Sequence, residues 1–331
     1  MIFNSLTLQN RFNYICNGVN DNVNLLTFIA QIQSRGYSRF IINIIGEFKV
    51  NGSKTTVDSI AWSMYLNNTA AEYTLDFSQA DEIEANGNFI LANNVKIIGC
   101  RIKYSSGSDV IGVRGLNSTF IGCSINGNFS GGACYGFSGN GSYFYDCQVE
   151  IYNASGNATG IYGTYNTLDR CNIKATSNTG SAYAADLTSE CRVSNSRLEG
   201  ITNAAGTTTS GNGGVGGGYY TNCILIGKGG LKGHGLYLRA AHVLAAANCV
   251  FRGYTKNPTS GLGAGISGAG DEACTYMLHC INCNQAAETG YSQTDSIFLQ
   301  AGYGVCTGMF YTAAEVPTTF NLLAGFNRNR V

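Results

Sequence analysis

Charged residues are scarce in this sequence, and proline is almost absent. Asp, Glu, Lys and Arg together make up 12% of the 331 residues, about half the share found in an average soluble domain. The 20 basic and 20 acidic residues give a formal net charge of zero. A neutral chain lacks the excess of Lys and Arg that binds nucleic acid or an anionic membrane surface. We therefore expect neither nucleic acid nor membrane lipid as the main partner.

Long hydrophobic runs are missing as well. The sequence has no apolar window of about 18 residues, so it predicts no membrane insertion. Its first residues lack the basic segment and apolar stretch that mark a secretory signal. We expect a protein that is made and kept in a cytoplasm until something larger carries it out.

Glycine is as common as proline is rare, with 44 Gly against 2 Pro. Apolar residues make up 44% of the chain, which excludes a disordered composition. Gly and Asn tolerate left-handed backbone angles, so their abundance favours many tight bends between short strands.

The thirteen cysteines follow a repeat. Spacings of 23, 24 and 24 residues separate the first four members of a column, and similar local sequences continue it: Cys100, Cys123, Cys147, Cys171, Ser196, Cys223, Cys249 and Cys280. Self-similarity at a fixed period is the signature of a repeat fold. Because the number of cysteines is odd and their spacing is structural, we expect buried, reduced thiols rather than disulfides.

Other columns keep fixed offsets from the cysteines. Aliphatic residues such as Ile102 and Ile125 lie two positions after, and apolar residues such as Ile97 and Phe120 lie three positions before. Residues two apart on a strand share a face, so the cysteines and the aliphatic residues after them should point inward. The position just before each cysteine is mostly Gly or Asn, with Asp146 and Arg170 as departures, and predicts a left-handed bend.

A third strand begins at Gly112, Gly136 and Gly160, again 24 residues apart. Three short strands and three turns fit a coil of about 24 residues. The pattern predicts an all-β fold, a single-stranded right-handed parallel β-helix. A β-sandwich is the alternative, but its hairpin turns would not produce one inward cysteine column.

The N-terminal part predicts a cap for this solenoid. Residues 22–35 carry a helical apolar stripe, with Asp21 or Asn22 as the N-cap and Gly36 as the stop. Residues 39–50 predict the first buried strand. We divide the chain into an attachment leader (1–16), a capping helix and first strand (17–50), a parallel β-helix (51–310) and a C-terminal cap or interface tail (311–331).

The segment from Gly18 to Asn22, the helix after it and residues 36–50 resemble the opening module of the pectate-lyase-like right-handed parallel β-helix family, which includes phage tailspikes. Two departures are Asn22, where the family has a second Asp, and the lack of a Pro before Gly46. The resemblance implies a virion structural or receptor-binding protein, similar to a tailspike or tail fibre. Such a protein would be assembled into a virion in the host cytoplasm, with an extracellular protein as the alternative. The implied partners are a homotrimer of the chain itself, other virion proteins and a host surface polysaccharide. A polysaccharide lyase or glycoside hydrolase on the same scaffold is the alternative.

Candidate catalytic residues are carboxylates at outward positions. Glu150, Lys174 and Glu199 lie three positions after the cysteine column and should stack about 4.8 Å apart. Glu150 and Glu199, two coils apart, are near the spacing of an inverting glycosidase. The alternative is a charge ladder, in which Lys174 holds both carboxylates ionised. Asp169, near Asp146 at neighbouring bends, is either an acid/base residue or a turn residue.

Candidate glycan-binding residues are Tyr162, Tyr237 and Lys174. Both tyrosines follow the glycine of the third strand and should point outward, where they would either stack on sugar rings or pack against other subunits. The three His residues are isolated, and Cys280 and Cys283 have no second cysteine pair. The sequence therefore predicts no metal and no cofactor.

Overall fold

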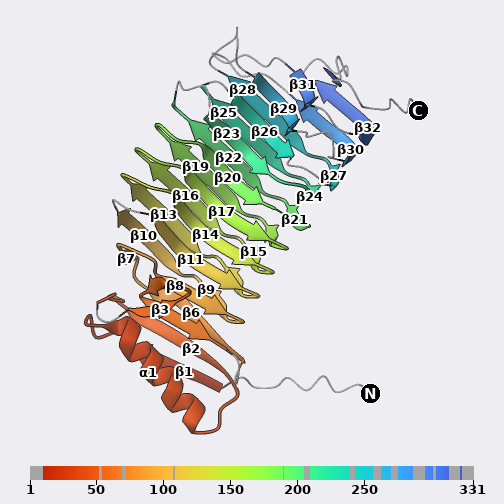
Figure 1. The fold of residues 1–331 in the computed structure, drawn as a ribbon. Coiled ribbons are helices and arrows are strands. Elements are labelled where there is room, and N and C mark those ends of the chain that lie inside the picture. The colour runs from red at the N-terminus through yellow and green to blue at the C-terminus, as the bar shows by residue number, and fades with distance from the viewer. Residues whose placement is uncertain are drawn as a thin grey trace, which may run out of the picture.

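Parallel strands stacked coil upon coil make up most of the described chain (Figure 1). The computed structural model describes residues 10–51, 54–68, 72–106, 109–188, 190–204, 209–230, 232–238, 243–255, 262–269, 275–285, 295–300, 303–312 and 321–322. Within these residues the chain is a right-handed parallel β-helix of about seven turns, roughly 24 residues apart. The predicted fold class is confirmed.

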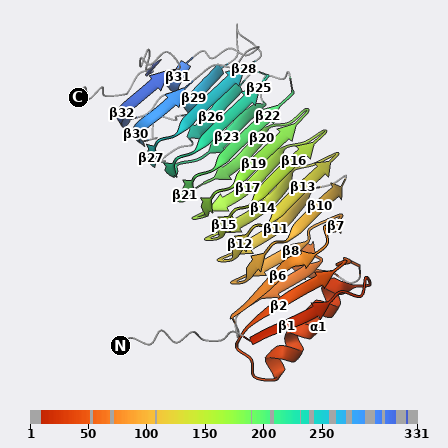
Figure 2. The same ribbon diagram turned by 180° about the vertical axis from the view of Figure 1, so that it is seen from behind.

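Each complete coil contributes one strand to each of three stacks, which run the length of the solenoid in both ribbon views (Figures 1 and 2). The first stack consists of short strands: β9 (Lys96–Ile98), β12 (Thr119–Ile121), β15 (Tyr143–Tyr145), β18 (Thr167–Asp169), β21 (Cys191–Ser194), β24 (Gly218–Thr221) and β27 (Val243–Ala247). The second stack follows the cysteines: β7 (Ile83–Ala85), β10 (Arg101–Ser106), β13 (Ser124–Phe129), β16 (Gln148–Asn153), β19 (Asn172–Ser177), β22 (Arg197–Thr202), β25 (Ile224–Gly229) and β28 (Val250–Thr255).

The third stack forms a separate sheet: β5 (Met64–Asn67), β8 (Ile90–Asn93), β11 (Val110–Leu116), β14 (Cys134–Asn140), β17 (Ala158–Thr164), β20 (Ala182–Leu187), β23 (Ser210–Val215), β26 (Lys232–Leu238), β29 (Leu262–Ala269), β31 (Asp295–Gln300) and β33 (Asn321–Leu322). The longer strands β2 (Arg39–Gly46), β6 (Glu72–Ala80), β30 (Thr275–Gln285) and β32 (Tyr303–Thr312) pair with the first two stacks, and β3 (Thr55–Val57) forms a hairpin with β4 (Ile60–Trp62).

The core columns predicted from the sequence are in register. Cys100, Cys123, Cys147 and Cys171 are at most 2% exposed, and Ser196 continues their column at 3%. None of the described cysteines is in a disulfide. Burial raises the pKa of the Cys100 thiol to about 12, which suits an inert core side chain.

The predicted left-handed bend precedes the members of the column from Cys100 to Cys249. The assignment of Cys280 to the column was wrong, because Cys280 pairs with Ala246, three positions before Cys249, within the continuous strand β30. Asp146 and Arg170, which depart from the Gly or Asn pattern, still have φ angles of 54° and 53°. The bend is therefore set by the coil geometry, and Gly or Asn only lowers its cost.

A second buried column is polar and was not predicted. Ser118 Oγ accepts the backbone N–H of Val95 at 3.2 Å, and Ser142 Oγ accepts that of Ser118 at the same distance. Asn166 Oδ1 then accepts the N–H of Ser142 at 3.0 Å. Each side chain thus satisfies a buried amide of the preceding coil, at a turn where no strand partner reaches it.

Helix α1 (Asp21–Ser34) packs on the N-terminal end of the solenoid, as predicted (Figure 1). Leu25, Ile29 and Ile32 are buried in the core cluster. The N-cap prediction was wrong, because Asn20 is the N-cap, in a left-handed conformation without a side-chain cap.

The Asp21 side chain serves another purpose than capping. It accepts the backbone N–H groups of Asn17, Gly18 and Lys49 and the hydroxyl of Tyr14. This carboxylate therefore ties the segment before the helix to the one after β2. No helix among the described residues has the length and hydrophobicity needed to cross a membrane.

Part of the expected attachment leader belongs to the solenoid. Strand β1 (Asn10–Ile15) pairs in parallel with β2, and Tyr14 is buried at 8% exposure. The apolar residues Ile2, Phe3, Leu6 and Leu8 lie outside the described residues. Of the expected C-terminal tail, Leu322 pairs with Leu299, and Phe320, Leu323 and Phe326 lie outside the described residues.

We predict that the docked face of α1 is essential for stability. Leu25→Asp would bury a carboxylate in the end of the core and should cost several kcal/mol, lowering the melting temperature. Val23→Asp is the matched control, since Val23 lies on the same helix but is 37% exposed. Equal melting temperatures for the two variants, measured by circular dichroism, would show that the helix is not docked.

Candidate functional site

The candidate residues from the sequence lie on different stacks. Glu150, Lys174 and Glu199 are on the second stack, Asp169 is on the first, and Tyr162 and Tyr237 are on the third. The fold therefore does not gather them into a single site.

The charge ladder on the second stack has the predicted register but different pairing. Glu150 pairs with Lys174 and Lys174 with Glu199 along the coils. Lys174 Nζ lies 2.9 Å from Glu150 Oε1. The expectation that Lys174 also holds Glu199 was wrong, because Glu199 contacts Arg197 at 3.0 Å and Lys228 at 3.3 Å instead.

The contacts with Arg197 and Lys228 make Glu199 a poor general acid. Burial alone would raise the pKa of its carboxyl, but Arg197 and Lys228 outweigh burial and the pKa is lowered. A general acid in glycoside hydrolysis needs the opposite shift. The surroundings of Glu199 thus suit a structural carboxylate.

Asp169 is held in a corner network. Arg170 contacts Asp146 at 2.7 and 2.9 Å and Asp169 Oδ2 at 2.6 Å. Asp169 Oδ1 accepts from Ser194 Oγ at 2.7 Å and Asn195 Nδ2 at 2.8 Å. The hydrogen bond from Ser194, then those from Asn195 and the charge of Arg170, lower the pKa of Asp169 despite its burial.

Tyr162 and Tyr237 point outward but are not neighbours. Asp186 and Val215 lie between them in the register, so they are three coils apart, about 14 Å. Tyr162 packs edge-on against Tyr135, and Tyr237 stacks on His234. They do not form one platform for a ligand.

The first stack carries a more coherent set of side chains. Tyr143, Thr167, Arg192 and Tyr219 are successive register partners, so they form one outward column. Tyr145 and Asp169 are register partners in the next outward column, where they follow Ile98 and Ile121. We call these six residues, together with Tyr165 at the adjoining bend, the tyrosine face.

The aromatic rings of this face are accessible. Tyr143 is 46% exposed, Tyr165 61% and Tyr219 52%. The rings of Tyr143 and Tyr145 are nearly parallel, with centroids 6.4 Å apart. The Arg192 guanidinium lies 6.0 Å from the centre of the Tyr219 ring, within the range of a cation–π contact.

Tyr165 occupies an unfavourable backbone conformation. Its φ is 55°, in the left-handed region, whereas the equivalent bends of earlier coils carry Asn94, Asn117 and Gly141. A bulky side chain there costs about 1 kcal/mol or more relative to residues that tolerate this conformation. Strain of this kind gathers at binding sites.

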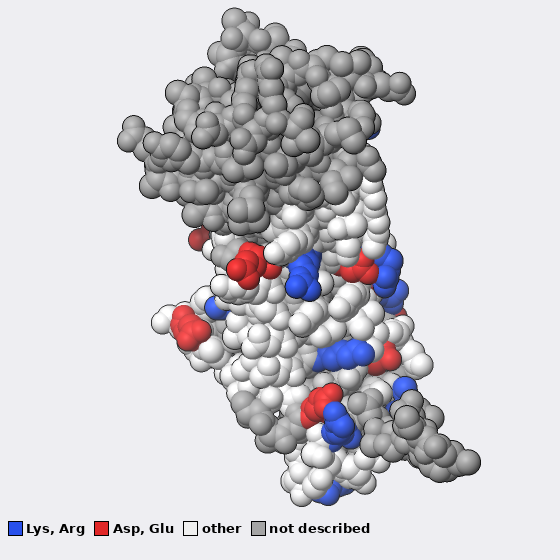
Figure 3. All heavy atoms as spheres, turned by 90° about the vertical axis from the view of Figure 1, so that its right-hand side faces the viewer, with Lys and Arg blue, Asp and Glu red and all other residues white. Residues whose placement is uncertain are grey.

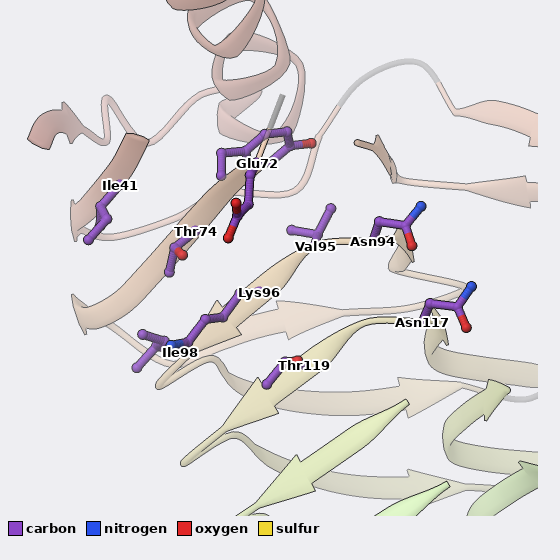
Figure 4. Close-up of a pocket in the computed structure, with 10 residues that line it drawn as sticks. Ile41, Glu72, Thr74, Asn94, Val95, Lys96, Ile98, Asn117 and Thr119 are labelled. Atoms are coloured by element: carbon purple, nitrogen blue, oxygen red, sulfur yellow. The ribbon is translucent and has the colours of Figure 1, made fainter. Parts of the chain in front are cut away.

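A hollow of about 280 Å³ opens on the same stack, toward the N-terminal end (Figure 4). Thr74, Lys96 and Thr119 contribute to its wall and belong to the column that continues into Tyr143. Ile98 adds an apolar side, and Glu72, ion-paired with Arg39, closes another. The hollow and the tyrosine face therefore form one continuous surface.

Charge is sparse on this side of the molecule. Strands β15, β21 and β24 run along the right-hand side of Figure 1, which faces the viewer in Figure 3. Acidic and basic side chains there are few, and several lie next to a side chain of opposite charge on a largely uncharged surface. Within the part of the chain that is described, no three His, Cys, Asp or Glu side chains are grouped as metal ligands.

Sequence reasoning missed most of this face, although a signal was present. Tyr143, Thr167, Arg192 and Tyr219 all lie four positions before the cysteine column. The later coils are longer by one to three residues, so only alignment on the cysteines reveals the column. The strained bend at Tyr165 had no sequence signal, because a left-handed tyrosine is rare.

Comparisons with known proteins add similarity in structure but not in sequence. No protein-family model matches the chain, and no curated protein is similar to it in sequence. Among solved structures, tailspike protein 3 of bacteriophage CBA120 aligns with a TM-score of 0.34 and 10% identity, over 86% of this chain. The chain spans 56% of the length of that phage protein. At this level of similarity, the evidence for the fold is the register of the coils themselves.

We predict that Asp169 stabilises the fold in a pH-dependent way. Its pKa in the folded protein lies below the ordinary value of 3.8. Its contribution is therefore present above about pH 4 and is lost as the pH falls through the lowered pKa. Asp169→Asn should cost about 1–3 kcal/mol at pH 7, and this cost should fall steadily as the pH is lowered below about 4, measured by urea unfolding.

Glu150→Gln is the control for this experiment. Its carboxylate is 61% exposed and makes one ion pair, so its loss should cost less than about 1 kcal/mol. A cost for Asp169→Asn that does not depend on pH would contradict the assignment.

Proposed function

We propose that this protein is a receptor-binding β-helix of a virion, similar to a phage tailspike or tail fibre, that binds a surface glycan on its tyrosine face. The observation that carries the proposal is the group of exposed tyrosines around Thr167, Asp169 and Arg192. Sugars present apolar C–H faces that stack on aromatic rings, and hydroxyl groups that hydrogen-bond to polar side chains. The tyrosine face offers both kinds of contact.

The rigidity of the face supports the same proposal. Every residue of the outward column is fixed by parallel pairing on both sides, so little conformational entropy is lost on binding. Tyr143 and Tyr145 have two side-chain torsions each and their rings already lie parallel. A preformed aromatic platform on a flat sheet suits an extended polymer better than a compact ligand.

The assembly is part of the proposal. A trimer of the chain, with attachment to other virion proteins, follows from the tailspike resemblance of residues 17–50. The alternative function is a polysaccharide lyase or a glycoside hydrolase, and the hydrolase requires a general acid with a raised pKa. Asp169 and Glu199, two of the three candidates, have lowered pKa values instead.

The test is a screen of bacterial surface glycans by microarray, followed by titration of the glycans that bind. Tyr143→Ala should weaken the affinity about 3- to 10-fold, since one aromatic stacking contact is worth about 0.5–1.5 kcal/mol. Tyr162→Ala is the matched control, because it removes an exposed tyrosine from the third stack. Equal losses in both variants would contradict the assignment of the site. Release of shortened products would favour the enzyme.

Substitution of Tyr165 should change stability and glycan binding in opposite directions. Tyr165→Asn should raise the free energy of unfolding by about 1 kcal/mol, because Asn tolerates the left-handed bend. The same change should weaken glycan binding. A variant that is less stable, measured by urea unfolding, would refute the strain assigned to this bend.

A further inference from the structure

The tyrosine face places a cation against an aromatic ring. Arg192 is exposed, and its guanidinium lies over the ring of Tyr219, one coil further along. A guanidinium held against an aromatic face keeps its donor edge available. Tyr219 therefore acts as a positioning residue for Arg192, whereas Tyr143 and Tyr145 remain open for stacking.

The acidic groups near Arg192 do not neutralise it directly. Asp169, one coil back, has both carboxylate oxygens engaged by Arg170, Ser194 and Asn195. Glu190 is two residues away in the chain, at the bend before β21. Among the described residues, Arg192 makes no ion pair with either carboxylate or with any other.

The spacing matches an extended glycan. Arg192 is two coils from Tyr143, about 10 Å. A glycan lying along the solenoid axis would therefore stack one sugar on Tyr143 and Tyr145 and present a substituent of a later sugar to Arg192. Lys96 in the hollow is a second cation of the same column, and it too makes no ion pair among the described residues.

We propose that the glycan bound on the tyrosine face is acidic, and that Arg192, positioned by Tyr219, binds its negatively charged group. This inference rests on the proposed function. The planar fork of an arginine fits the paired oxygens of a carboxylate or a phosphate. The ligand class is a polysaccharide whose repeat carries a uronic acid, another carboxylate or a phosphodiester.

The test uses matched polysaccharides. Uronic acid polymers are compared with their methyl esters, which keep the sugars and linkages but lose the charge. Phosphate-containing and neutral bacterial polysaccharides complete the panel. We expect esterification to weaken binding about 10-fold or more, because charge-assisted hydrogen bonds to a fixed arginine are lost. The carboxylate and phosphate arms identify which acidic group is recognised.

Single substitutions test whether Arg192 is the side chain that binds the acidic group. Arg192→Gln should lower the affinity for the acidic glycan about 10- to 100-fold. Arg192→Lys should recover only part of the loss, because lysine keeps the charge but not the fork. Tyr219→Leu should reduce the affinity while leaving the dependence on salt. Arg114→Gln is the control, since it removes a guanidinium from β11 on the other sheet.

The outcomes separate this inference from the function on which it rests. Binding of neutral glycans only, or equal binding of a polymer and its methyl ester, would overturn the acidic class but leave glycan binding intact. Unchanged affinity in Arg192→Gln would overturn the role of Arg192. Failure of every polysaccharide in the panel to bind would overturn the proposed function itself.

Discussion

Hydrogen bonding between successive coils is the constraint on which the rest of this structure depends. Within the three stacks, each inner strand pairs in parallel with the strand one coil before and the strand one coil after, about 4.8 Å away. A residue therefore has the same orientation as its partners above and below. Inward columns become a continuous core, and outward columns become straight rows of side chains. The row from Tyr143 to Tyr219 is a consequence of this register.

Inward side chains change in size along the solenoid, while the register between coils stays the same. One inward column runs from Ala85 through Tyr104, Gly127, Ile151 and Ala175 to Gly200 and Gly227, so its residues differ widely in size. A Cβ at Gly200 would lie 2.0 Å from the carbonyl oxygen of Asn212, so the two sheets approach as closely as their backbones allow. The core is thus narrow at Gly200, while the register between coils is unchanged.

The sequence predicted the fold in detail because each coil repeats the same physical problem. Three features recur in enough coils that their copies can be aligned: the inward cysteines, the aliphatic residues two positions later and the left-handed bends. The polar column of Ser118, Ser142 and Asn166 recurs too, but small polar residues are also typical of turns, so their burial could not be inferred. Asp21 was mistaken for a cap, because its acceptor role depends on Lys49, far away in the sequence.

The site was harder to predict than the fold. Outward positions vary freely in a solenoid, so a single sequence does not separate a functional tyrosine from an incidental one. Tyr162 and Tyr237 have the same offset from a glycine but lie three coils apart. Tyr143 and Tyr219 belong to one continuous column, with Thr167 and Arg192 between them. Charge partners were also unpredictable, since Glu199 pairs with Lys228 of the next coil rather than with Lys174.

The register of the first stack is the claim on which the tyrosine face rests, and cross-linking tests it most directly. Thr167 and Arg192 are paired across a coil that is one residue longer than 24. With cysteines at both positions, Cα atoms about 4.8 Å apart are within the range of a disulfide. We expect Thr167→Cys with Arg192→Cys to cross-link under mild oxidation, as detected by mass spectrometry of peptides. Thr167→Cys with Ser194→Cys, displaced by two residues, should not. Efficient cross-linking of the displaced pair, or none in the paired positions, would contradict the register and with it the tyrosine face.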